Sequence, residues 1–241
     1  MVGNSTLPSP PHPSSTISAR ACYEANPAVA TTRASSVTTA HPDLDCVLIN
    51  SGIQRGFDFS APHTVDLSVV SDEFTTNYLA YLHLTNAFLP HLQSLASKGA
   101  SASPTALVFT TSGLALVPMA RCPNYCASKA ALHAYIMVLR EQLRDSDAGD
   151  VNVIELLPPA VQTELHDAKH QPDIKDGGQI GIPLAEYIDE TWRGLSGGAE
   201  SVPVGSAKEP FKPDGFETKR QQAFKGQAEK IKEMMRKHGS N

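Results

Sequence analysis

Tyr125 and Lys129 are the pair of residues whose types and spacing most clearly suggest chemistry. They bound the run Tyr125-Cys126-Ala127-Ser128-Lys129. Residues four positions apart share one face of a helix, so the lysine ammonium can lie near the phenol. A nearby positive charge favours the phenolate and lowers the pKa of a tyrosine from its reference value of about 10. The pair predicts a general acid/base; the plain alternative is two ordinary residues at the start of an amphipathic helix.

Ser112 is the second candidate, because it stands thirteen residues before Tyr125 and shortly after an apolar run at 106–109. If that run is a strand, Ser112 lies at the carboxyl end of a sheet, where open α/β folds bind their ligands. A turn serine without function is the simpler reading of Ser112 alone. A serine hydrolase is a poor alternative, since no Gly-x-Ser-x-Gly elbow surrounds Ser112 and no His–Asp pair is evident.

The elements that must position these residues alternate between strands and helices. Continuous apolar runs, typical of strands buried on both faces, predict strands at 46–49, 106–109, 151–156 and 201–204. Helices are expected from Ser71, as N-cap, to Leu95, from Pro123 to Leu143, over 183–195 and over 216–238. Pro90 should kink or shorten the first of these helices. The order predicts an α/β fold, a Rossmann-like doubly wound parallel sheet.

Composition divides the chain into three parts. Residues 1–42 contain six prolines and no sustained apolar period, and we expect a disordered or irregular segment there. Residues 43–210 form the Rossmann-like domain, and residues 211–241 a charged, solvated helix and tail. Arg20 and Arg33 in a Ser-rich start are similar to a transit peptide, but the prolines argue against the amphipathic helix that such a peptide needs.

Together these features resemble the short-chain dehydrogenase/reductase family. Its active site combines a serine after the fifth strand with a Tyr-x-x-x-Lys on the following helix, and Ser112, Tyr125 and Lys129 match in order and interval. The resemblance covers about 43–204 and is strongest over 107–132. It implies an oxidoreductase that transfers a hydride between NADP or NAD and a carbonyl or secondary alcohol.

Within this resemblance, other positions acquire expected roles. Asn50 and Gly52 align with the ends of the family's Asn-Asn-Ala-Gly turn, and Thr163 with a segment that contacts the nicotinamide carboxamide, although Pro159 replaces a glycine there. Asn77 matches the asparagine that completes a proton relay to the lysine through water. Tyr125 would be the acid/base, Ser112 would stabilise the substrate oxygen, and Lys129 would lower the tyrosine pKa and bind the nicotinamide ribose. The resemblance also implies a homo-oligomer.

The glycine-rich turn with which the family holds the dinucleotide has no counterpart here. Gly3 is the only glycine before Gly52, and no apolar strand precedes Cys46. The sequence therefore predicts a sheet whose first strands are absent, with 46–49 as an open apolar edge. The alternative function is a truncated, non-catalytic family member that cannot bind a dinucleotide tightly.

The remaining composition favours a soluble, cytoplasmic protein with a small-molecule partner. The apolar fraction is 41% and the net charge is −5, which give no reason to expect nucleic-acid or membrane binding. No apolar run is long enough to span a bilayer. The cysteines show neither metal-site nor disulfide-framework spacing, so no metal site is expected. His83, His91 and His133 are expected to be surface or core histidines.

Overall fold

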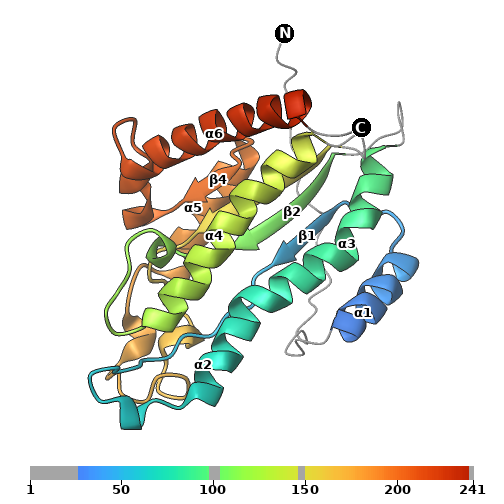
Figure 1. Cartoon of the computed structure of the whole chain (residues 1–241). Helices are drawn as coiled ribbons and strands as arrows, with labels where there is room; N and C mark the ends of the chain where they lie inside the picture. The colour runs from blue at the N-terminus through green and yellow to red at the C-terminus, as the bar shows by residue number, and fades with distance from the viewer. Residues whose placement is uncertain (1–26, 98–103, 146–149, 239–241) are drawn as a thin grey trace.

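A parallel sheet forms the centre of the molecule. The computed structural model describes residues 27–97, 104–145 and 150–238. The sheet in these residues has four strands: β1 (Cys46–Ile49), β2 (Thr105–Thr110), β3 (Val151–Leu157) and β4 (Ser201–Pro203). They are all parallel and pair in the order β1-β2-β3-β4 (Figure 1). The strands lie where the apolar runs predict them, within about one residue. The predicted α/β fold with a Rossmann-like parallel sheet is confirmed.

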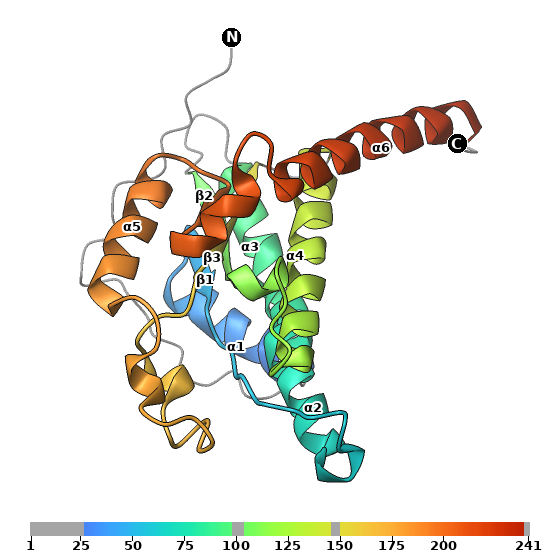
Figure 2. The same cartoon turned by 90° about the vertical axis from the view of Figure 1, so that its left-hand side faces the viewer.

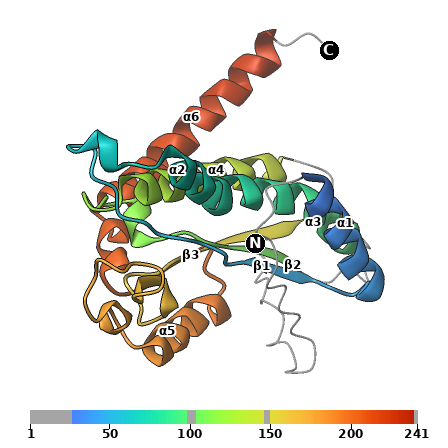
Figure 3. The ribbon, with the colours of Figure 1, turned by 90° about the horizontal axis from the view of Figure 1, so that it is seen from below.

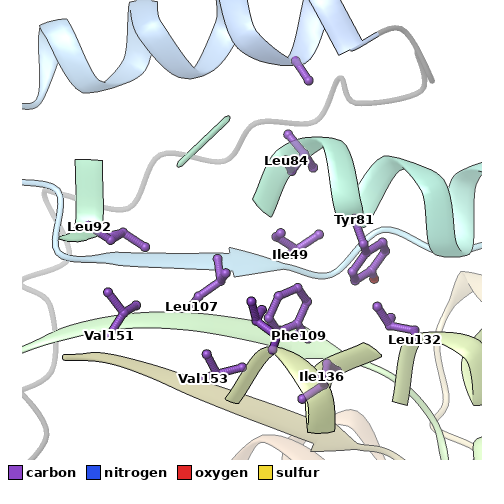
Figure 4. Close-up of a cluster of buried hydrophobic side chains, with 12 residues drawn as sticks. Ile49, Tyr81, Leu84, Leu92, Leu107, Phe109, Leu132, Ile136, Val151 and Val153 are labelled. Carbon is purple, nitrogen blue, oxygen red and sulfur yellow. The ribbon is translucent and has the colours of Figure 1, made fainter. Parts of the chain in front are cut away.

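Helices cover the sheet on both faces. α3 (Ala80–Ala96) and α4 (Pro123–Arg144) lie on one face, and α5 (Leu184–Ser196) lies on the other (Figure 3). Under α3 and α4, the first core cluster includes Leu107, Phe109, Leu132 and Ile136 (Figure 4). A smaller cluster on the α5 face joins side chains of β2, β3 and β4, with residues of α5 packed against it. All six residues of β2 are buried, because this strand is covered on both faces.

β1 departs from the expected burial. It was predicted to be buried on both faces, yet Leu48 is 56% exposed, Cys46 is also exposed and only Ile49 is fully buried. The reason is its place in the sheet. Among the described residues β1 is the outer strand, and the cluster under α5 begins at β2.

An additional helix lies in the segment expected to be irregular. α1 (Pro27–Ala40) packs against α3, with Ala30 and Ala34 buried in the contact (Figure 1). The expectation for 1–42 is therefore wrong over 27–40. Its inward positions are alanines four residues apart, which permit close packing but give no apolar stripe that the sequence pattern could reveal. For residues 1–26 the expectation lies outside the described residues.

One long helical segment follows the loop after β1. It consists of α2 (Leu67–Phe74), a π-helical turn η3 (Thr75–Leu79) and α3. Its N-cap is Asp66, whose Oδ1 accepts a hydrogen bond from Ser68 N at 2.8 Å, so the prediction of Ser71 as N-cap is wrong. The helix begins before Ser71 because Asp66 satisfies its first free N–H groups. It continues past Pro90 to Ala96 and is not shortened there.

The charged C-terminal segment is helical, as predicted. α6 (Phe216–His238) starts against α4 and projects from the body of the molecule (Figure 2). Most of its side chains are exposed, but Glu217 in its first turn is completely buried. None of the helices in the described part of the chain is long and apolar enough to cross a bilayer.

Candidate active site

The candidate residues converge at the carboxyl ends of β1 and β2. Ser112 follows β2 and is 6% exposed. Its Oγ accepts a hydrogen bond from Leu114 N at 3.1 Å and so caps the short helix η5 (Gly113–Ala115). Gly113 N donates to Pro158 O at 2.9 Å, which ties this turn to the segment after β3. These two hydrogen bonds fix the turn that carries Ser112.

Lys129 is buried beneath the same turn. Its Nζ donates to Thr110 O at 2.8 Å and lies 5.8 Å from the ring centroid of Tyr125 and 5.2 Å from that of Tyr81. Tyr125 and Lys129 therefore share one face of α4, as their spacing predicts. Burial disfavours the ammonium and lowers the pKa of Lys129 to about 7, although the negative charge of Glu155 opposes this shift.

The phenol of Tyr125 does not have the predicted lowered pKa. Burial raises the pKa of Tyr125 well above its ordinary range, and a hydrogen bond from the Ser112 hydroxyl opposes this only in part. The expectation of a lowered pKa is wrong in this structure, because the phenolate would have to form in a site from which water is largely excluded. The same burial makes Lys129 a weaker source of positive charge.

Asn77 lies in the π-helical turn η3 and is completely buried. Its Oδ1 accepts from Ile53 N at 2.9 Å, while its Nδ2 donates to Ile53 O at 2.8 Å and Ser128 Oγ at 3.2 Å. The loop after β1 is thus attached to α4 beside Lys129. A Cβ atom placed on Gly52 would lie 3.5 Å from Asn77 Oδ1 and 3.6 Å from Lys129 Nζ. Gly52, Asn77 and Lys129 are therefore neighbours.

Asn50 and Thr163 have other surroundings. Asn50 is exposed just after β1. Thr163 caps the short helix η6 (Glu164–His166), with its Oγ1 accepting from Leu165 N at 3.4 Å. No hydrogen bond joins either residue to Tyr125 or Lys129 within the described residues. The contacts described above bring together Ser112, Tyr125, Lys129, Asn77 and Gly52, and they do not include Asn50 or Thr163.

The structure contains a cavity of about 260 Å³. Gln171 forms part of its wall and donates to Gln54 Oε1 at 3.1 Å. Gln54 Nε2 in turn donates to Cys122 Sγ at 3.4 Å, next to the first turn of α4. Ser112, Tyr125 and Lys129 are not among the residues that line this cavity. Its lining comes instead from the segments after β1 and β3 (Arg55, Gly56, Phe57, Thr64, Asp66, Val69, His170, Gln171, Pro172, Asp173).

Two buried carboxylates near the site were not anticipated. Glu73 receives Arg55 N at 2.8 Å and Asn124 Nδ2 at 2.6 Å, and so links the loop after β1 to the start of α4. Glu155 on β3 is also fully buried. Its position was a signal that the sequence offered, because a charged residue between the apolar Ile154 and Leu156 in a strand requires a partner when it is buried. No group of His, Cys, Asp and Glu in the described residues is placed to hold a metal ion.

The structure thus combines a parallel α/β sheet with a serine after one strand and a Tyr-x-x-x-Lys on the next helix. A family model described as short chain dehydrogenase matches residues 20–173. The chain belongs to the short-chain dehydrogenase/reductase family.

Two curated relatives agree with this assignment. The oxidoreductase DltE of Bacillus subtilis, described as uncharacterized, is 38% identical over 162 residues, which are 67% of this chain and 59% of that protein. The 1-deoxy-11-beta-hydroxypentalenate dehydrogenase of Streptomyces avermitilis is 31% identical over 153 residues, which are 64% of this chain and 53% of that protein. The matches therefore span little more than half of the length of these relatives.

Solved structures share the fold. A short chain dehydrogenase from Burkholderia cenocepacia, in complex with NADP, superposes with a TM-score of 0.61 at 24% identity, covering 85% of this chain and 77% of that one. A short chain dehydrogenase/reductase from Burkholderia phymatum, in complex with NAD, gives a TM-score of 0.64 at 17% identity, covering 76% and 69%. At these identities the likeness concerns the fold.

Proposed function

We propose that this chain is an oxidoreductase that interconverts a carbonyl and a secondary alcohol with NADP or NAD, and that Tyr125 is its acid/base. The observation that carries the proposal is the meeting of Ser112, Tyr125 and the buried amine of Lys129 at the carboxyl ends of the parallel strands. Open α/β sheets bind their ligands at this edge.

In the proposed reaction, Tyr125 passes its proton to the substrate oxygen during reduction. Because burial keeps the Tyr125 pKa high, the phenol is protonated at neutral pH, which suits an acid better than a base. Ser112 would donate a hydrogen bond to the same oxygen and stabilise the charge that develops there. Asn77 would hold the loop after β1 against α4, next to Lys129.

The residues present fit the nicotinamide half of a dinucleotide. The absence of a side chain at Gly52 leaves space beside Lys129 Nζ, which uses one hydrogen bond on Thr110 O and has other hydrogens to donate. Lys129 and Tyr125 would hold the nicotinamide ribose, with Asn50, Gly52 and Thr163 around it. When bound, the cofactor would supply or accept the hydride.

The diphosphate half finds no comparable partner in the described part of the chain. Residues 27–51 contain no glycine, and α1 begins at Pro27, so no glycine-rich turn opens a helix there. This observation favours the second candidate, a family member that does not hold a dinucleotide tightly. We therefore expect weak binding of both cofactors, without discrimination of the 2′-phosphate.

The proposal extends to partners and location. We propose that the substrate is a small carbonyl or alcohol and that the protein forms a homo-oligomer in the cytoplasm, without a nucleic-acid or membrane partner. The NADP and NAD complexes of the two Burkholderia proteins support the choice of cofactors and do not select between them.

Calorimetric titration of the purified chain with NADPH and NADH tests cofactor binding, and nicotinamide absorbance with a panel of carbonyl compounds tests turnover. Tyr125→Phe should reduce turnover at least about 10²-fold, because it removes the proton donor and leaves the ring in place. Tyr187→Phe, on the opposite face of the sheet, is the matched control and should retain turnover.

Wild-type turnover in Tyr125→Phe would exclude Tyr125 as the acid. Absence of both binding and turnover in the wild-type chain would favour the non-catalytic candidate. Tight, selective binding of one cofactor would contradict the expected weak diphosphate site.

A further inference from the structure

A buried carboxylate lies directly behind the turn that carries Ser112. Glu155 is completely buried, and its Oε1 accepts a hydrogen bond from Thr111 Oγ1 at 2.7 Å. Thr111 stands between Thr110, whose carbonyl receives Lys129 Nζ, and Ser112. Glu155 is therefore one hydrogen bond away from the backbone segment that holds both candidate side chains.

His133 and Glu217 complete this group. His133 Nδ1 lies 2.7 Å from Glu155 Oε1, and His133 Nε2 lies 3.1 Å from Glu217 Oε1. All three side chains are fully buried. Burial opposes a charged imidazole, but the hydrogen bonds and charges of the two carboxylates outweigh it and raise the pKa of His133 to about 9. The group is thus a carboxylate–imidazolium–carboxylate bridge from β3 through α4 to α6.

Lys129 belongs to the same electrostatic unit. Lys129 and His133 are four residues apart on α4, so both face the sheet one turn from each other. The charge of Glu155 acts on Lys129 as well as on His133. Arg140 lies a further two turns along α4, and the charge of Glu155 also favours its charged form. The Arg140 guanidinium donates a hydrogen bond to Val153 O at 2.9 Å. Glu155 is therefore the carboxylate common to three buried cations of α4.

On its other side, Lys129 has no carboxylate in contact among the residues that the structure describes. Its Nζ faces the rings of Tyr81 and Tyr125, and the backbone oxygen of Thr110. Burial raises the pKa of both phenols, so these rings are neutral at neutral pH. At the far end of the bridge, Glu217 also pairs with Arg220 at 2.8 Å and accepts from Gln221 at 3.0 Å.

We propose that Glu155 is a positioning residue for the site: its carboxylate holds the Thr111–Ser112 turn and its negative charge favours the ammonium form of Lys129, while His133 and Glu217 hold the carboxylate in place. A role of Glu155 in catalysis rests on the proposed function. The electrostatic effect of Glu155 on Lys129 is independent of that function, and it can be measured on the chain without substrate or cofactor.

The test follows the titration of Lys129 by NMR in protein labelled with ¹³C at the lysine side chains, with Lys129→Arg to assign the signal. In Glu155→Gln the midpoint should move to lower pH by about one pH unit, because loss of a nearby negative charge disfavours the ammonium. Thr111→Val is the matched control. It removes the hydrogen bond to Glu155 but leaves the charge, and the Lys129 midpoint should stay in place.

Glu155→Gln leaves His133 beside only one carboxylate, which can prevent folding. In that case Glu155→Gln is combined with His133→Gln, which replaces the charged pair by two amides that can hydrogen-bond to each other. The Lys129 midpoint in this double variant is compared with that in His133→Gln alone, so that the two proteins differ only in the Glu155 charge. Circular dichroism confirms folding of each variant before titration.

An unchanged Lys129 midpoint in a folded variant that lacks the Glu155 carboxylate would overturn the inference. A midpoint that moves equally in Thr111→Val would also overturn it, since the effect would then come from the turn and not from the charge. A chain without turnover in which the Lys129 midpoint shifts as expected would contradict the proposed function and leave this coupling intact.

Discussion

Burial determines the chemistry of the individual side chains at this site more than their spacing does. The pKa of Lys129 falls to about 7 and that of Tyr125 rises, because each group would have to carry its charge away from water. The pKa of His133 is raised, whereas that of Lys129 is lowered, although His133 lies only one turn further along the same helix. The difference is that His133 has two carboxylates within hydrogen-bonding distance.

The charged His133 should make stability depend on pH. Its folded pKa of about 9 exceeds the unfolded value of 6.5, so its stabilising contribution is complete below about pH 6.5 and is lost as the pH rises through 9. The contribution is on the order of 3 kcal/mol. We expect the difference in free energy of unfolding between wild type and His133→Gln to shrink by this order between pH 6 and about pH 9.5. Urea denaturation at a series of pH values measures it.

Comparing the two proteins at each pH cancels the contribution of other groups, including Lys129, whose lowered pKa acts in the opposite direction over part of this range. A difference that stays constant with pH would show that His133 carries no additional proton in the folded chain.

The elements that place the site were predictable where a local pattern encodes them. Continuous apolar runs located all four described strands, and the i, i+4 rule placed Tyr125 and Lys129 on one face of α4. α1 was missed because its buried positions are alanines. The bridge through His133 could not be inferred, since its partner Glu217 lies 84 residues away and only the fold brings α6 to α4.

The start of α2 gives an element-scale prediction. Asp66 Oδ1 accepts from both Ser68 N and Ser68 Oγ, at 2.8 and 2.6 Å. Asp66→Ala leaves the first N–H groups of the helix without this acceptor and should lower the free energy of unfolding by about 1 kcal/mol. Asp66→Asn retains an oxygen acceptor and should cost clearly less. Denaturant unfolding of the three proteins compares them, and equal losses in both variants would rule out capping as the cause.

At the scale of the whole molecule, the sheet is covered unevenly. α3 and α4 shield one face, whereas the cluster beneath α5 on the other face begins at β2. Leu48 on the outer strand β1 consequently remains 56% exposed. An exposed apolar residue on an outer strand is a site at which chains can pair with one another.

Leu48→Lys should therefore reduce concentration-dependent association, because a charge on an outer strand opposes pairing between chains. Static light scattering over a concentration series measures the effect. Ile231→Lys, a change of similar character on an exposed position of α6, is the control and should have a smaller effect. Equal effects of the two variants would point to net charge and not to the strand as the cause.

The π-helical turn η3 determines how the helix would respond to the deletion of a residue. Successive residues of an α-helix are rotated by about 100°, so positions four apart drift by about 40° at each step. Glu73, Asn77 and Tyr81 nevertheless all have fully buried side chains. The wider turn at Thr75–Leu79 absorbs one extra residue and limits this drift. Removing a single residue there would restore regular pitch and rotate Glu73 away from Arg55 and Asn124. The helix can thus accept substitutions at Leu79, which is exposed in this turn, but a deletion of one residue would separate the two halves of its buried face.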